Sequence, residues 1–532
     1  MQIVWRIKYK LFNYRPVALP QAESIKWPVS WSSPAWNMAN WDGKRTFTFL
    51  SQSGSIKTKS DWIDLKFGAL WAYNLHYLDC LTSESNFSNE CKQTLLMDWI
   101  DNNKDVNSIG WDPYCLSLRL VNIIKWYSRA QISDQTIVQS AAQQAHALLA
   151  KREYHIQANH LFSNGKALVF VGAFIKGALG DKCLQAGLKI LDNELTKQFF
   201  SDGGHYELSP MYHQILMWDI CDLINLAHIS DDMYLQARIE RWSKLLIKAD
   251  YWRQAMYHTN GELAFFNDCA LGIAPPNYVI DSYLQKVHCE SISSTEQYCD
   301  LQGTGFLVVP IQKHGKLIFD AGSVGPDYQP GHAHADSLSL ELSLFNSRVF
   351  VNSGTSLYGT SQLRQKQRET VSHNTVEIDG ISSSQVWGGF RVAKRANVTE
   401  RIIQRNENSL VLSATHNGYV KQKVAGRHAR KINVALESNK IEIEDNVVRN
   451  ASSKAVARFY LHPDVVINFV DSSSTKLLVD ENEVVVQVAG GLIKVEDSLW
   501  FPRFGQQVSN SVLNIVFVED SIKTTLSWSD KD

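Results

Sequence analysis

The spacing of apolar residues changes once along this chain of 532 residues, and that change most constrains its fold. In the first half apolar side chains recur at helical intervals, as in SLRLVNIIKWYSRA at residues 117–130. Beyond about residue 303 short runs rich in β-branched residues alternate with turn residues, without helical stretches between them. We therefore expect an α+β multidomain chain, in which helices come first and an antiparallel β-sandwich follows.

The expected boundaries follow from where each pattern begins and ends. Residues 1–65 are interrupted by four prolines and are predicted to form an irregular extension that packs on the helical domain. Residues 66–290 carry seven to nine expected helices, one of which begins at Pro210 and another of which spans 232–250. SISSTEQYCDLQGTG is polar and poor in helix formers, so we place the linker near 290–302 and the β domain at 303–532.

Composition and charge exclude several classes of protein. Lys and Arg total 53 and Asp and Glu total 54, a net charge of -1 that argues against a dedicated nucleic-acid binder. Eight cysteines show no C-x-x-C spacing, which argues against a disulfide framework or zinc ribbon. No apolar stretch is long enough to span a membrane. The basic start lacks the apolar core of a signal peptide, which predicts a cytoplasmic protein, or a periplasmic one if the given start is internal.

Three polar clusters are candidates for chemistry. QANHLFSNGKAL places Asn159 and His160 at a predicted helix start, where Asn159 can act as a helix cap or as part of a site. DGGHYELSPMYHQ places Tyr212 in the first turn of the next predicted helix, as a proton donor or a packed aromatic residue. PGHAHADSLSLEL is the most specific, because His332 and His334 would face the same side of a strand.

Two imidazoles on one face are costly to bury without a proton, metal or substrate role. A lone histidine is more often an ordinary core residue, but the H-x-H pattern favours function. Downstream, SHNTV contributes His373 and RVFVNSGT contributes Asn352. Imidazole nitrogen with an amide or carboxylate oxygen can together hold an ion such as zinc.

These segments resemble the heparinase II/III family of polysaccharide lyases, which includes heparan and alginate lyases. The matching stretches are NHLFSNGKAL, DGGHYELSPMYH, PGHAHADSLSLEL, VNSGT, RETVSHNTV and WGGFRVAKRA, in the family's order. The resemblance covers most of the chain. It implies an incomplete (α/α) toroid followed by a β-sandwich, and β-elimination of an acidic, uronic-acid-containing polysaccharide in a cleft between them, without an organic cofactor.

The resemblance also implies roles for single residues. Asn159 and His160 match the pair that neutralises the substrate carboxylate as charge develops on it. Tyr212 matches the catalytic tyrosine that protonates the leaving glycosidic oxygen and in some members also abstracts the proton. His332 matches the histidine proposed as base for the opposite stereochemistry.

Further positions match residues that surround the site in relatives. His334, Asn352 and His373 match the ligands of a structural metal, but relatives usually have Asp at the position of Asn352. Because a neutral amide is a weaker zinc ligand than a carboxylate, the sequence predicts either a weak ion site or a hydrogen-bond network there. Arg368 and Arg391 match recurrent arginines, and guanidinium groups pair bidentately with carboxylates, although bridging the two domains is an equal alternative. Tyr358 is a candidate for the cleft wall.

Two other functions remain open at this point. A glycoside hydrolase would need two carboxylates flanking the bond, and Asp202, Glu207 and Asp336 lie near the motifs without an evident pairing. A non-catalytic glycan-binding or accessory protein of bacterial surface-polysaccharide biosynthesis would suit the missing export signal.

Overall fold

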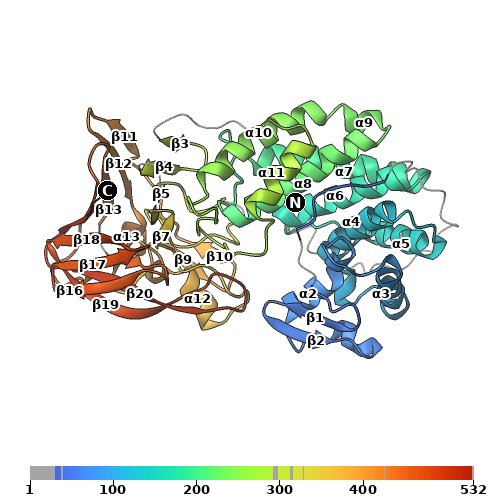
Figure 1. Cartoon of the computed structure of the whole chain (residues 1–532), viewed down its shortest axis with the longest axis horizontal. Coiled ribbons are helices and arrows are strands. Elements are labelled where there is room, and N and C mark those ends of the chain that lie inside the picture. Colours follow the sequence, from blue (N-terminus) through green and yellow to red (C-terminus); the bar gives the residue numbers. More distant parts are fainter. Residues whose placement is uncertain are drawn as a thin grey trace. The chain divides into compact units, whose positions relative to one another are not determined.

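The computed structural model describes residues 30–36, 40–290, 298–311, 315–326, 329–424 and 426–529. The N-terminal half is mainly helical and the C-terminal half is built of antiparallel strands (Figure 1). The chain divides into two compact units. The first comprises Met1–Phe199, Ile215–Ile247 and Pro275–Ser291, and the second Phe200–Gln214, Lys248–Ala274 and Ile292–Asp532. Two stretches from the helical half of the sequence therefore belong to the strand-rich unit.

The first unit contains the predicted succession of helices. Its α-helices are α2 (Ala69–Tyr77), α3 (Asn89–Asn102), α4 (Pro113–Arg129), α5 (Gln135–Lys151), α6 (Ala158–Phe174), α7 (Ala178–Gln198), α9 (Met233–Gln236) and α11 (Asn277–Lys286). It also holds most of α8 (Pro210–Ile229) and the first half of α10 (Ile239–Ala255). The single helix predicted at 232–250 is thus two helices, since α9 ends at the C-cap Ala237.

Glycines set the close approach of two neighbouring helices in this unit. A Cβ atom at Gly187 of α7 would lie 2.7 Å from the carbonyl oxygen of Gly165 and 2.8 Å from the backbone nitrogen of Val169, both on α6. Such distances leave no room for a side chain without a backbone shift. The α6–α7 pair can therefore pack backbone against backbone, which a sequence pattern of apolar residues does not reveal.

A two-stranded hairpin precedes the helices within the part of the N-terminal region that the structure describes. It consists of β1 (Thr46–Phe49) and β2 (Gln52–Ser55). The ring of Phe49 lies edge-on to that of Trp71 on α2, with centroids 5.4 Å apart. Most of the tryptophans described in the first unit are buried in the same way, so they serve as core residues.

The second unit is built from three antiparallel sheets and a hairpin. One sheet has the order β3 (Cys299–Leu301), β4 (Phe306–Ile311), β5 (Gly315–Asp320), β6 (Leu340–Leu344), β7 (Ser347–Phe350). A second has the order β19 (Gly491–Trp500), β20 (Val508–Phe517), β15 (Ala455–Tyr460), β8 (Val376–Ile378). The third has the order β11 (Ile402–Arg405), β12 (Ser409–His416), β13 (His428–Ala435), β14 (Lys440–Val447), β21 (Ser521–Trp528), β18 (Asn482–Ala489), β17 (Ser474–Val479), β16 (Val466–Val470).

Side chains from all three sheets share one hydrophobic core, as a β-sandwich requires. Leu342, Phe459 and Leu526, one from each sheet, are at most 1% exposed. The separate hairpin pairs β9 (Gln385–Trp387) with β10 (Arg391–Ala393). Two short helices complete the unit, α12 (Gln362–Arg368) and α13 (Gly418–Gln422).

The predicted strand through the two histidines is wrong. β6 begins only at Leu340, and residues 331–339 form a succession of turns between β5 and β6. The alternating pattern of DSLSLELSLF suggested that this strand begins earlier. In the structure, side-chain hydrogen bonds of the loop take the place of backbone pairing with a neighbouring strand. The predicted linker is only partly visible, because residues 291–297 lie outside the described residues and β3 begins at Cys299.

The glycine contact between α6 and α7 yields a stability prediction. Gly187→Ala forces a methyl group against the α6 backbone, so we expect the unfolding free energy to fall by about 1–3 kcal/mol despite the better helix propensity of alanine. Thermal unfolding followed by circular dichroism measures the change. Gln185→Ala, on the exposed side of α7, serves as the matched control, and equal melting temperatures for both variants would contradict the packing argument.

Candidate active site

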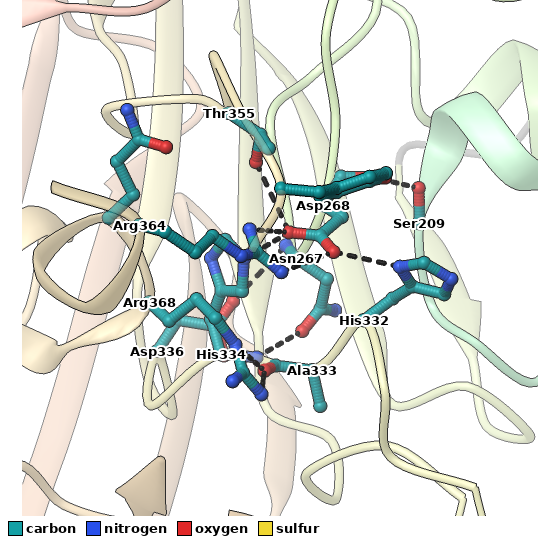
Figure 2. A network of polar contacts seen from close by, with 12 residues as sticks. Ser209, Asn267, Asp268, His332, Ala333, His334, Asp336, Thr355, Arg364 and Arg368 are labelled. Atoms are coloured by element: carbon teal, nitrogen blue, oxygen red, sulfur yellow. Dashed lines mark hydrogen bonds and ion pairs between the residues drawn. The ribbon is translucent and has the colours of Figure 1, made fainter. Parts of the chain in front are cut away.

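The carboxylate of Asp268 is the centre of a buried polar network in the second unit (Figure 2). Its Oδ2 lies 2.8 Å from Nδ1 of His332, and its Oδ1 lies 2.8 Å from Nε2 of His334. Arg364 donates to the same group through both terminal nitrogens, one to Oδ1 and the other to Oδ2 at 2.7 Å. One carboxylate thus fixes the orientation of both histidines of the H-x-H motif.

Asp268 and Arg364 form a buried ion pair in this network. Burial raises the pKa of Asp268, but the Arg364 guanidinium and the hydrogen bonds from the two histidines more than reverse this and hold it well below its usual value. Burial lowers the pKa of His334 to about 4, so its imidazole is neutral near pH 7. The network therefore contains one ion pair with neutral imidazole at His334, an arrangement that a buried site tolerates because the carboxylate and the guanidinium are paired.

Backbone contacts hold the loops that carry these side chains. The backbone nitrogen of Asp268 donates to the carbonyl of His332 at 3.1 Å, and that of His334 donates to Oδ1 of Asn267 at 3.0 Å. Asn267 also donates through Nδ2 to the carbonyl of Leu208, at 2.9 Å. Leu208 and Asn267 both adopt φ of 56°, in the left-handed region that such residues rarely occupy. Strain of this kind persists where surrounding contacts enforce it, often at functional sites.

Tyr212 lies beside His332, as the sequence predicted for two residues of one site. It stands in the first turn of α8, and its ring centroid is 4.2 Å from that of His332. Its hydroxyl is 2.8 Å from the hydroxyl of Tyr358, which is the residue predicted for the cleft wall. Burial raises the pKa of the Tyr212 phenol well above its usual value of 10, so the phenol keeps its proton at neutral pH.

The two predicted arginines occupy different environments. Arg368 is fully buried and donates to the carbonyl of Ala333 at 2.9 Å and to that of Arg391 at 3.3 Å. These contacts describe a residue that supports the histidine loop rather than an open carboxylate clamp. Arg391 lies on the exposed hairpin strand β10 and remains available to a ligand.

A metal ion fits one corner of the network, with a different ligand set from the one predicted. Ligand atoms of the buried residues His334, Asp336 and His373 lie within 4.8 Å of one another. His334 Nδ1 and both ring nitrogens of His373 have no hydrogen-bond partner. Asn352, in contrast, donates to the carbonyl of Phe265 at 2.9 Å and accepts from the backbone nitrogen of Asn374 at 3.1 Å. Asp336 therefore replaces Asn352 as the candidate third ligand.

The predicted neutralising pair lies in the first unit. Asn159 is in the first turn of α6 and not at its N-cap, which is Gln157, so the capping interpretation is wrong. His160 Nδ1 is 3.1 Å from Oε1 of Glu153, and its ring stacks on that of Tyr114 with centroids 4.3 Å apart. Gln157 and Ala158 have φ of 65° and 53°, a second concentration of backbone strain beside predicted site residues.

Two of the three carboxylates considered for a hydrolase have other contacts or candidate roles. Asp202 accepts hydrogen bonds from the backbone nitrogen of Thr304 at 2.7 Å and from its hydroxyl at 3.0 Å. Asp336 belongs to the candidate metal cluster. Glu207 is buried, with Oε1 4.0 Å from His332 Nε2. No observation on these three residues favours glycoside hydrolysis.

Sequence reasoning missed Asp268 and Arg364. Asp268 stands in the segment FFNDCA, far from the H-x-H motif and without a pattern of its own. Arg364 precedes the recognised Arg368 by four residues, a spacing that puts both on one face of α12. That spacing could have indicated from the sequence that Arg364 lies near Arg368. The role of Asp268 is visible only in the structure, where the fold places its carboxylate beside His332 and His334.

Comparison with protein families gives two matches that together span most of the chain. The profile described as heparinase II/III N-terminus matches residues 82–269, and the one described as heparinase II/III-like, C-terminal, matches residues 296–529. A heparin-sulfate lyase of Bacteroides stercoris is 31% identical over 87 residues, which is 16% of this chain and 13% of that protein.

Solved structures match over nearly the whole chain. A heparinase III matches with a TM-score of 0.71 and 15% identity, covering 99% of this chain and 89% of that one. A mutant of the heparan sulfate lyase HepC from Pedobacter heparinus matches with a TM-score of 0.65 and 15% identity, covering 100% and 88%. These likenesses confirm the predicted fold class, a helical toroid followed by an antiparallel β-sandwich.

The buried ion pair yields the second prediction. Asp268→Asn leaves the Arg364 guanidinium without its counter-charge, so we expect a loss of about 3–5 kcal/mol of unfolding free energy. Because the folded pKa of Asp268 is depressed, its contribution is fully present above about pH 4 and is lost as the pH falls through the folded value. The difference between parent and variant should therefore shrink in acid.

Urea unfolding at several pH values measures this difference. Glu483→Gln is the control, because it breaks the exposed pair with Lys476 and should cost less than about 1 kcal/mol. A loss no larger for Asp268→Asn than for this control would contradict the central place of Asp268.

Proposed function

The chain belongs to the heparinase II/III family of polysaccharide lyases, and on that premise we propose that it cleaves a uronic-acid-containing polysaccharide by β-elimination. The observation that carries the proposal is the pairing of an oriented imidazole, His332, with a protonated phenol, Tyr212, at ring contact. β-Elimination needs one group that takes the C5 proton and one that protonates the departing oxygen. These two side chains supply both.

His332 acts as the base. Its Nδ1 donates to the Asp268 carboxylate, which fixes the tautomer and leaves the Nε2 lone pair as the basic site. Nε2 takes the proton from C5 of the uronate, and the C5–H electrons form the new double bond to C4. The partnership of Asp268 with Arg364 keeps the carboxylate ionised, so that it orients the imidazole throughout the cycle.

Tyr212 acts as the acid. As the bond between C4 and the glycosidic oxygen breaks, the phenol gives its proton to that oxygen. Its raised pKa ensures that the proton is present at neutral pH, and the hydroxyl of Tyr358 aligns the phenol at 2.8 Å. Because the phenol is already protonated at neutral pH, it cannot accept the C5 proton without first losing its own, which favours His332 as the proton acceptor.

Asn159 and His160 retain the role that their match to the family implies. Amide and imidazole N–H groups stabilise the substrate carboxylate while proton removal increases its negative charge. Glu153 supports this assignment for His160, because its carboxylate accepts from Nδ1 and so holds the ring in place.

His334, Asp336 and His373 would hold a divalent cation. Such a cation would supply positive charge beside the buried Asp336 carboxylate, and His334 and His373 would provide its nitrogen ligands. The chain's own groups suit this role, because burial raises the pKa of Asp336, and of its neighbour Asp320, above the usual carboxyl range. Asp268 accepts from the outer nitrogen of His334, as carboxylates do behind metal-bound histidines.

A heparan-type glycosaminoglycan is the proposed substrate, since a curated relative is named a heparin-sulfate lyase and one fold neighbour, HepC, is named a heparan sulfate lyase. Its uronate residues provide the C5 proton and the carboxylate that the mechanism needs.

None of the helices described is long and apolar enough to cross a membrane.

The test of this function is incubation with heparan sulfate, heparin and alginate, followed by the ultraviolet absorbance of new C4–C5 double bonds. We expect unsaturated product from at least one polymer, and a fall in kcat of about 10²–10⁴-fold in Tyr212→Phe, because general acid catalysis is removed. Tyr278→Phe, at a tyrosine that is 74% exposed, is the control. Unsaturated product formed equally by both variants, or reducing ends without unsaturation, would refute the mechanism.

Metal content separates the two candidate ligand sets. The protein is stripped with chelator, incubated with Zn²⁺, Mn²⁺ or Co²⁺, and analysed by mass spectrometry of the bound metal. We expect Asp336→Asn to lower affinity by more than about tenfold, and Asn352→Ala to keep the ion. Loss of metal from Asn352→Ala with retention in Asp336→Asn would overturn the assignment of Asp336.

A further inference from the structure

The hairpin β9–β10 carries two large aromatic side chains that the fold leaves exposed. Trp387 and Phe390 are 46% and 41% exposed. Trp387 and Arg391 face each other across the hairpin, and the Arg391 guanidinium lies 4.6 Å from the centre of the indole ring. The loop between them, Gly388 and Gly389 followed by Phe390, turns with positive φ at both glycines.

Two buried arginines anchor this hairpin to the catalytic network. Arg364, which pairs with Asp268, also donates to the carbonyl of Gly389 at 3.2 Å. Arg368, which holds the histidine loop through Ala333, donates to the carbonyl of Arg391 (Figure 2 shows both arginines). The tip of the hairpin is therefore fixed by the same groups that fix His332.

Close packing at the tip makes the position of the hairpin definite. A Cβ atom at Gly389 would lie 2.2 Å from the carbonyl oxygen of Gly359, so only glycine permits this approach. The ring of Phe390 then reaches the site, with its centroid 6.0 Å from that of His332 and 5.3 Å from that of Tyr358. Trp387 and Arg391 are therefore exposed on this hairpin, while one part of the Phe390 ring at its tip packs beside His332 and Tyr358.

We propose that Trp387 and Arg391 form a subsite for an anionic sugar that flanks the cleaved residue of the polymer. This inference rests on the proposed function and adds a substrate-recognition element to it. An exposed indole offers an apolar face to the C–H groups of a sugar ring. The guanidinium, which makes no hydrogen bond or ion pair through its side chain with any residue in the described part of the chain, offers a planar fork to a carboxylate or sulfate.

The contact between the Arg391 guanidinium and the Trp387 ring explains why this subsite needs both residues to bind an acidic sugar. Stacking of Arg391 on Trp387 restrains two long side chains before the ligand arrives, which reduces the entropy lost on binding. An isolated surface tryptophan would bind neutral and acidic sugars alike, whereas the paired guanidinium selects the acidic ones. The subsite thus predicts a preference for substrates long enough to reach beyond the cleaved bond.

The experiment measures binding without turnover. Tyr212→Phe serves as the background, and its affinity for a heparan sulfate disaccharide and hexasaccharide is measured by calorimetry, with and without Trp387→Ala or Arg391→Gln. We expect each added substitution to weaken hexasaccharide binding by about tenfold, as interface tryptophans and arginines commonly do when truncated. Disaccharide binding should change less than twofold. Phe469→Ala, at a residue 50% exposed on β16, is the matched control and should change neither.

Each result bears on the proposal. Hexasaccharide affinity that survives Trp387→Ala, or that falls equally for both oligosaccharides, overturns the flanking subsite while leaving the lyase function intact. Absence of binding by the Tyr212→Phe background, together with absence of unsaturated product from the parent chain, overturns the proposed function and with it the subsite. Selective loss of the hexasaccharide supports both.

Discussion

The ion pair between Asp268 and Arg364 is the interaction on which the candidate site depends. Both side chains are fully buried, so neither charge is tolerable without the other. The same carboxylate accepts from His332 and His334, and the same guanidinium reaches the β9–β10 hairpin. One charge pair thereby contacts His332, the candidate metal ligand His334 and the β9–β10 hairpin.

The sheets provide the rigid frame for this pair. Residues 331–339 leave the frame between β5 and β6, and α12 follows β7, so the histidines and Arg364 stand on loops and a short helix at the edge of one sheet. Asp268 and Tyr212 reach the same place from segments 248–274 and 200–214, which belong to the strand-rich unit although the surrounding sequence is helical. Functional groups on loops held by a rigid scaffold are a common solution.

Much of this was predictable from the sequence, and the reasons for the failures are physical. Helical and alternating periodicities identified both halves, and the motifs identified Tyr212, His332 and Tyr358, which the fold brings together. Periodicity could not reveal that β6 starts only at Leu340, since polar side chains that bind each other look the same in sequence as those of a strand. Nor could it show Asp268, or Asp336 as a candidate metal ligand in place of Asn352, because both depend on contacts between residues distant in sequence.

In the proposed mechanism the imidazole of His332 takes a proton and the phenol of Tyr212 gives one, and no water enters the products. Elimination breaks the glycosidic bond without adding water, whereas hydrolysis inserts a water oxygen into the product. Cleavage of heparan sulfate in water labelled with heavy oxygen, followed by mass spectrometry of the fragments, tests the central claim most directly. With the reducing ends reduced at once to stop their exchange of oxygen with water, we expect each cut to give one fragment with a C4–C5 double bond and no fragment that carries the label. Labelled fragments without unsaturated partners would contradict the elimination.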